Sequence, residues 1–245
     1  AELADDLNLA YPYVEFQQVE DKYKVGFNIN QIKRSEDIHL GRTLRARLGY
    51  SGWHGERLVT EGEWHDTWLA RDKMLLQSSV DWRGRWNVQA QAIEDAEVNA
   101  RVRFHREQTA SRSLVLSMAF ALLKNPPAHA ELTLGGDKGL RGYRSRYLSG
   151  DTTLLFGAEQ RLFTRYEPFG LFNVGFAAFV DVGRAVFRGV DSPRDGWKAD
   201  VGVGLRLLPS KADKDQVIHL DVAFPVNDSN SGRSMLISAE VKKTL

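Results

Sequence analysis

The chain has 245 residues, 33 basic side chains against 32 acidic ones, no cysteine and 42% hydrophobic residues. This balance lacks the basic footprint of a nucleic-acid-binding protein, and the absence of cysteine excludes disulfides and thiolate metal sites. No apolar run approaches the ~20 residues of a membrane-spanning helix. A transmembrane β-barrel remains possible, because only alternate residues of its strands meet lipid.

The first ten residues form an acidic lead, which we interpret as a linker at 1–10 before a single domain at 11–245. The lead lacks a basic-then-apolar signal region, so an exported chain would be a mature form.

Between the linker and residue 125 the chain alternates apolar and polar side chains with a period of two, which predicts strands. The seven alternating segments are residues 11–18, 23–29, 38–50, 57–68, 74–88, 98–104 and 114–122. Their polar faces carry several arginines, among them Arg45 and Arg47. Such faces are too polar for a dry core, so we expect them to line a wet interior.

A glycine-rich stretch, Gly135 to Tyr143, interrupts the pattern, and five more alternating segments follow it. They are residues 154–162, 172–182, 197–207, 218–224 and 235–241. In the second of these, six apolar side chains are predicted to face outward: Phe172, Val174, Phe176, Ala178, Val180 and Val182.

A water-soluble sandwich is the alternative, because alternation does not show whether lipid or a second sheet covers the apolar face. Two features favour a membrane barrel. Segments such as residues 73–92 exceed the usual strand of ~5–6 residues. Aromatic residues, including Trp64, Trp82 and Trp197, also lie near segment ends, as an interfacial girdle requires.

Three motifs resemble a known family. Gly135-Gly136-Asp137 followed by Leu140-Arg141-Gly142-Tyr143 resembles the sixth extracellular loop of the BamA and TamA type of outer-membrane barrel, the bacterial surface antigen family. Gly157-Ala158-Glu159 and Phe179-Val180-Asp181-Val182-Gly183 resemble motifs of the two strands after that loop. The family includes outer-membrane protein insertases and two-partner-secretion translocators, and five strands follow the loop in it, as they do here.

The residues also suggest how the loop would be held. Arg141 offers five donors in a rigid fork, and Glu159 and Asp181 lie on the same face of their strands. The alternative is a solvated Arg141 that pairs with nothing. Glu159 can also pair with Arg161 or Arg206, and Asp181 with Lys198, and such pairs do not conflict with the contact to Arg141. The residues predicted to hold the loop in the lumen are Gly139, Leu140, Arg141, Gly142, Tyr143, Glu159, Phe179, Asp181 and Gly183.

We therefore predict an all-β transmembrane antiparallel barrel of about 12 strands, within a range of 10 to 16, with a long loop folded into its lumen. Its last segment, 235–245, should pair with the first, 11–29. The resemblance implies a monomeric barrel in the bacterial outer membrane that inserts or translocates proteins. Its partners would be outer-membrane lipids and a polypeptide substrate or periplasmic domains.

The resemblance implies no cofactor and no chemical step. The six histidines lack the spacing of metal ligands, and Gly202-Val203-Gly204 lies in a strand with no helix after it, unlike a dinucleotide site. The competing functions are a passive pore or structural barrel, and an outer-membrane hydrolase whose serine site is assembled from distant residues.

Overall fold

The computed structural model describes residues 10–52, 55–127, 130–189, 196–211, 216–227 and 235–243, so the predicted linker lies almost entirely outside the described residues. Fourteen strands make up the described fold: β1 (Tyr13–Val19), β2 (Lys22–Phe27), β3 (Ser35–Ser51), β4 (Arg57–Arg71), β5 (Met74–Asn87), β6 (Ala92–Thr109), β7 (Arg112–Lys124), β8 (Leu132–Leu134), β9 (Leu148–Gly150), β10 (Thr152–Phe163), β11 (Phe172–Val186), β12 (Lys198–Pro209), β13 (Gln216–Pro225) and β14 (Leu236–Lys243). Two single-turn 3-10 helices, Gly136–Lys138 and Pro168–Gly170, join them. Among these residues, no helix is long and apolar enough to cross a membrane.

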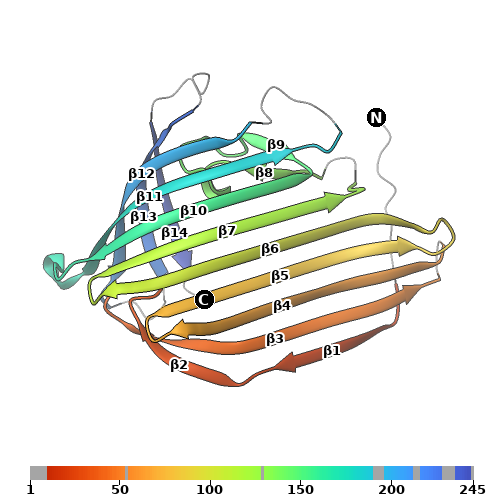
Figure 1. Ribbon diagram of the computed structural model, residues 1–245, viewed down its shortest axis with the longest axis horizontal. Helices are drawn as coiled ribbons and strands as arrows, with labels where there is room; N and C mark the ends of the chain where they lie inside the picture. Colours follow the sequence, from red (N-terminus) through yellow and green to blue (C-terminus); the bar gives the residue numbers. More distant parts are fainter. Residues whose placement is uncertain are drawn as a thin grey trace.

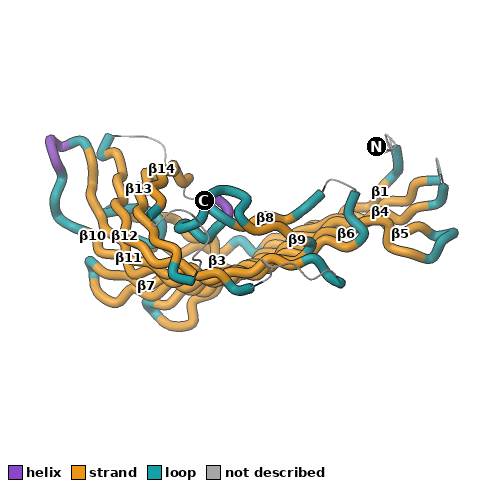
Figure 2. Tube along the Cα trace, turned by 90° about the horizontal axis from the view of Figure 1, so that it is seen from above, coloured by secondary structure: helices purple, strands orange, loops and turns teal. Residues whose placement is uncertain are grey.

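Twelve of the strands form one antiparallel sheet in the order β1-β3-β4-β5-β6-β7-β10-β11-β12-β13-β14, with β2 also paired to β3 (Figure 1). Seven of its strands precede the glycine-rich stretch and five follow it, which confirms the predicted all-β class and strand count. β8 and β9 pair only with each other and form a small hairpin on the concave side of the sheet (Figure 2).

The predicted closure is wrong, because the sheet is open. Within the described residues, β14 pairs with β13 alone, and β1 and β2 pair with β3 alone. β1 and β2 lie end to end along the same edge, since β1 pairs with residues 43–49 and β2 with residues 35–40. Twelve strands therefore fill eleven positions. Neighbouring strands of this sheet run in opposite directions, so the first and the eleventh positions run in the same direction. The two edges therefore cannot pair with each other in the antiparallel way that closes bacterial barrels.

The two faces of the sheet differ in exposure. Large apolar side chains on the convex face are exposed, whereas polar side chains on the concave face are buried. On β11, Phe176 and Val180 are 48% and 43% exposed on the convex face, whereas Asn173 and Asp181 are only 8% and 6% exposed on the concave face. The same parity holds on β12, where Val203 is 58% exposed and Arg206 is 3% exposed. On these two strands the charged and amide side chains thus lie inside, together with apolar ones such as Phe179 and Ala177, and the outer row is apolar.

Val174 is an exception to the predicted outward row. It shares the parity of Phe176 but is 6% exposed. The pairing of β10 with β11 continues past Phe163 here, because Thr164 donates to the Val174 carbonyl from both its backbone N–H and its hydroxyl, which places the β10–β11 turn next to Val174. In the outward row of β11, the exposed side chains are therefore those farther from the β10–β11 turn, Phe176, Ala178 and Val180.

At the end of the sheet opposite the glycine-rich stretch, the β2–β3 turn (residues 28–34) folds inward. Ile32 is 1% exposed and packs in a cluster with Phe163, Leu208 and Val217 of the opposite wall. Nη2 of Arg34 donates to the carbonyl oxygens of Pro209 and Ser210 at 3.4 and 3.2 Å.

The shape of this turn depends on one carboxylate. Glu36 accepts hydrogen bonds from the backbone N–H groups of three successive residues, 29 to 31, at 2.8–3.0 Å. The turn therefore joins the first hairpin to the far strands at one end, even though the edges do not pair.

Candidate functional site: the tongue on the concave face

The segment between β7 and β10, residues 125–151, forms a tongue that folds over the concave face of the sheet. Its β8–β9 hairpin contacts β7, β10 and β11. Leu140 and Tyr143 at its tip are 0% and 1% exposed and pack with Leu134, Leu148 and Ala185. A loop this long loses much conformational entropy when ordered, and these buried contacts offset part of that cost.

Arg141 joins the tongue to the sheet. Its Nε and Nη2 donate to the two carboxylate oxygens of Asp181 at 2.8 and 3.1 Å, and Nη1 donates to Glu159 Oε2 at 2.9 Å. The guanidinium carbon lies 3.3 Å from the centre of the Phe179 ring. Burial opposes the charged form, but the bonds to Asp181 and the charge of Glu159 outweigh it and raise the pKa of Arg141 above its usual value. Both hydrogen bonds expected from the sequence are therefore present.

The pairs of Glu159 with Arg206 and Arg161 were expected from the sequence, but the participation of Asp221 was not. Nη1 of Arg141 also donates to Asp221 Oδ2 at 3.3 Å, and Arg206 hydrogen-bonds to both Asp221 and Glu159. Arg161 completes the group by donating to Glu159 Oε1 at 2.7 Å. Alternation places all these side chains on one face, but it does not indicate which strands curve close enough for their side chains to meet.

The glycines of the tongue allow its close approach to the wall. Gly139 has a φ of +89°, and a Cβ there would lie 2.2 Å from Leu155 Cδ2. A Cβ on Gly142 would lie 2.6 Å from the Cβ of Asp200, a residue with no exposed surface. Side chains at either position would push the tongue away from the sheet.

The remaining predicted residues also lie in this contact. The Tyr143 hydroxyl is 3.1 Å from the carbonyl oxygen of Ala199 and 3.2 Å from Oδ1 of Asn227, which connects the tongue tip to β12 and the segment after β13. Gly183 lies beneath Leu140, whose Cδ1 would be 3.3 Å from a Cβ at that position. All nine predicted residues are thus brought together in one place.

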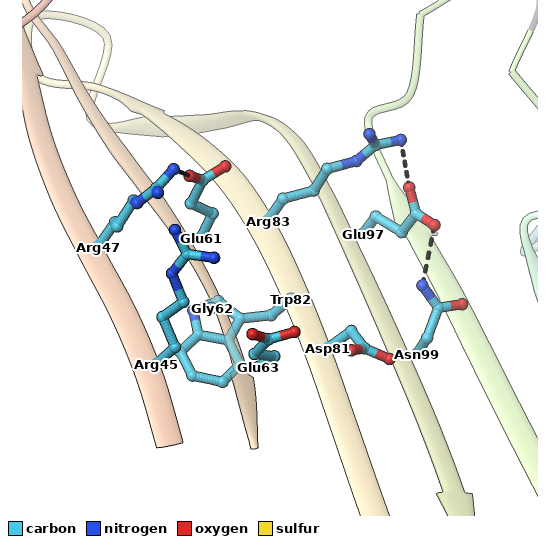
Figure 3. A pocket seen from close by; sticks show the side chains of 10 residues that line it. All are labelled: Arg45, Arg47, Glu61, Gly62, Glu63, Asp81, Trp82, Arg83, Glu97 and Asn99. Atoms are coloured by element: carbon cyan, nitrogen blue, oxygen red, sulfur yellow. Dashed lines mark hydrogen bonds and ion pairs between the residues drawn. The ribbon is translucent and has the colours of Figure 1, made fainter. Parts of the chain in front are cut away.

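The rest of the concave face, across β3 to β6, carries paired charges rather than one charged patch (Figure 3). Arg47 donates to Glu61, and Arg83 pairs with Glu97, which also accepts from Asn99. These pairs cross neighbouring strands, the arrangement that stabilises antiparallel sheets.

Glu63, His65 and Asp81 bring three potential metal-ligand atoms within 4.8 Å of one another, which the scattered histidines did not predict. Within this cluster His65 lies 3.8 Å from Glu63, and the positive charge of Arg101 lies 3.8 Å from Asp81.

Comparison with known proteins adds no family assignment: no protein-family model matches this chain, and no curated protein matches it significantly.

Proposed function

We propose that this sheet is the wall of a bacterial outer-membrane β-barrel that inserts proteins into that membrane or translocates them across it. The observation that carries the proposal is the attachment of Arg141, on a long tongue, to Asp181 and Glu159 on the concave face of a sheet whose convex face is apolar. The resemblance of the same residues to the surface antigen family supplies the transport role.

The strands have the length and surface that a membrane wall requires. β3 to β7 have 13 to 18 residues, more than the ~9–11 that a tilted strand needs to cross the hydrocarbon core. Apolar side chains on the convex face are half-exposed, as lipid-facing residues are before lipid covers them. In lipid, unpaired backbone groups cost several kcal/mol each. The proposal therefore requires partner strands along β14 and along β1–β2.

A passive pore is the competing barrel function, and the filling of the interior argues against it. The tongue covers the concave face near one end, and the β2–β3 turn crosses toward the opposite wall at the other. An interior occupied at both ends suits a gated conduit or an assembly platform better than an open channel.

The test is complementation in a bacterium that depends on this gene. We expect Arg141→Ala to enter the outer membrane but to lower the levels of other outer-membrane or secreted proteins. Arg146→Ala is the matched control, because Arg146 lies on the same tongue with a 67% exposed side chain and pairs only with Glu131 among the described residues. If the levels of other outer-membrane and secreted proteins stayed normal after the gene product was depleted, the transport role would be refuted.

A further inference from the structure

A cavity of about 370 Å³ lies inside the curve of the sheet, between the β2–β3 turn and the tongue network. Its walls come from β4, β5 and β6 on one side and from β10, β13 and β14 on the other. Six of its lining residues are basic or imidazole side chains that converge from both walls: His65, Arg101, Arg103, Arg161, His219 and Lys242. Arg101, Arg103, Arg161, His219 and Lys242 also line the adjoining cavity of about 850 Å³ beside the tongue, whose lining includes Glu159, Asp181 and Glu240. Among the described residues, those that line the smaller cavity itself include no acidic side chain.

Arg103 is the least compensated of these cations. Its Nη1 donates to Oδ1 of Asn30, a neutral amide, at 2.8 Å. In the described part of the chain no ion pair joins it to a carboxylate, and Glu159 and Glu36 attract it only from beyond that distance, although its side chain is partly buried. A guanidinium withdrawn from water without an anionic partner is costly, so the site favours an added negative charge.

The other cations are only partly neutralised by groups behind them. Arg161 contacts Glu159 through Nε at 2.7 Å and donates from Nη1 to the Ile29 carbonyl at 3.1 Å. Arg101 is 3.8 Å from Asp81, beyond hydrogen-bond distance, and Lys242 is 3.4 Å from Glu240.

His219 provides an independent indication of a missing ligand. It lines the cavity, is 8% exposed, and its buried Nδ1 has no hydrogen-bond partner. Buried polar atoms of folded proteins nearly always have a partner, so a solvent molecule or ligand belongs here.

We propose that this cavity binds a small, doubly charged oxyanion of the phosphate type. Forked guanidinium groups from opposite walls match the several oxygens of such an anion. Thr67, Gln77 and Ser79, which also line the cavity, add neutral donors. A bound anion would join β6 to β10 and β13 across the interior, where no strand pairing holds the walls together.

A phosphate group could come from solution or from a lipid headgroup. The lining residues are on the concave face, and the apolar convex face lies on the other side of the sheet. The geometry therefore favours a free anion. The inference depends on the concave face alone and holds whether or not the transport role is correct.

The experiment is calorimetric titration of inorganic phosphate into the full chain in a phosphate-free maltoside detergent, at constant ionic strength set by chloride. We expect saturable binding of one phosphate, weakened about tenfold or more by Arg103→Gln, since one lost charge-assisted hydrogen bond is worth at least that factor. Lys242→Gln, on the edge strand β14, should weaken binding as well and tests the site if Arg103→Gln does not fold.

Arg83→Gln is the control, because Arg83 lies on the same face but pairs with Glu97 and does not line the cavity. It should leave phosphate affinity unchanged. Titration of chloride in place of phosphate gives the background heat. The proposal would be overturned if phosphate gave no more heat than chloride, or if Arg83→Gln weakened phosphate binding as much as Arg103→Gln does. A second titration with micelles of a short-chain phosphatidic acid separates the two sources: binding of the lipid but not of inorganic phosphate would contradict a free anion.

Discussion

At the scale of the residue, the tongue depends on the geometry of one guanidinium. Arg141 makes a two-oxygen contact with Asp181 and reaches Glu159 and Asp221 with its remaining nitrogen, and its side chain is 16% exposed. A lysine would keep the charge but offer a single point donor. The planar fork is therefore what allows three carboxylates to be bound together.

We accordingly expect Arg141→Lys to be almost as destabilising as Arg141→Ala. Removing one partner of a buried ion pair costs roughly 3–5 kcal/mol. Urea unfolding of the detergent-folded protein measures the loss of free energy of unfolding. A lysine variant close to wild type would show that charge alone holds the tongue.

The carboxylates that Arg141 leaves behind should not be equally affected. Glu159 and Asp221 keep Arg206 as a partner, and Glu159 also keeps Arg161. Asp181 lies directly opposite Asp200 in the strand register and pairs with Arg141 alone among the ion pairs of the described residues.

Adding Asp181→Asn to Arg141→Ala should therefore recover part of the lost stability, because it removes a buried charge without a partner. Adding Glu159→Gln instead should recover nothing, since Glu159 remains paired. The same urea experiment compares both double variants with Arg141→Ala. Equal effects of the two additions would contradict this assignment.

At the scale of the element, the apolar row of β11 distinguishes lipid from water. Val180 is 43% exposed on the convex face, and arginine facing the middle of a bilayer costs roughly 2–4 kcal/mol. In water an exposed substitution is usually within ±0.5 kcal/mol. We expect Val180→Arg to lower the free energy of unfolding in lipid vesicles by roughly 2–4 kcal/mol, the cost of an arginine that faces lipid.

Ser117→Arg is the matched change on the concave face. Ser117 is exposed and lines the large cavity of about 850 Å³ beside the tongue, where an arginine has room. Asn173, which has the same inward parity, is a poorer control because it is only 8% exposed. If both arginine variants had equal effects in vesicles, the convex face would not face lipid.

The β2–β3 turn is the second element whose contribution can be measured. Ile32 is 1% exposed among Phe163, Leu208 and Val217, and truncating a buried isoleucine to alanine costs about 2–5 kcal/mol. Val25→Ala, on the neighbouring β2 at 65% exposure, should cost much less. Similar losses for the two variants, measured by urea unfolding, would mean that the turn is not packed against the far wall in solution.

At the scale of the whole molecule, the open sheet presents two edges that no described strand pairs. In the part of the chain that the structure describes, β14 uses only the hydrogen-bonding groups that face β13, and β1 with β2 only those that face β3. Water can satisfy the outer groups, but hydrocarbon cannot.

If the sheet lies in a bilayer, the outward amides of β14 should exchange with deuterium slowly in vesicles, because partner strands must bond them. Amide exchange measured by mass spectrometry with residue-level fragmentation checks this, with the amides of Arg165, Glu167 and Phe169 in the β10–β11 turn, which donate no hydrogen bond within the described residues, as a fast-exchanging reference. Fast exchange along β14 in vesicles would place that edge in water and argue against a membrane wall.

The sequence alone determined the strands, the strand count and the polar character of the concave face. It also indicated the pairing of Arg141 with Asp181 and Glu159. These features follow from local chemistry, because a two-residue period assigns each side chain to a face, and a forked cation beside two carboxylates on the same face has few other partners.

Only the tertiary structure decided that β1 and β2 share one edge, that the sheet stays open, and that Asp221 joins the tongue network. It also placed the β2–β3 turn against the opposite wall and brought Arg103, Arg161 and His219 to one cavity. These features depend on the curvature of the whole sheet, which sets the distances between strands far apart in the chain. A period of two assigns a side chain to a face but contains no information about those distances.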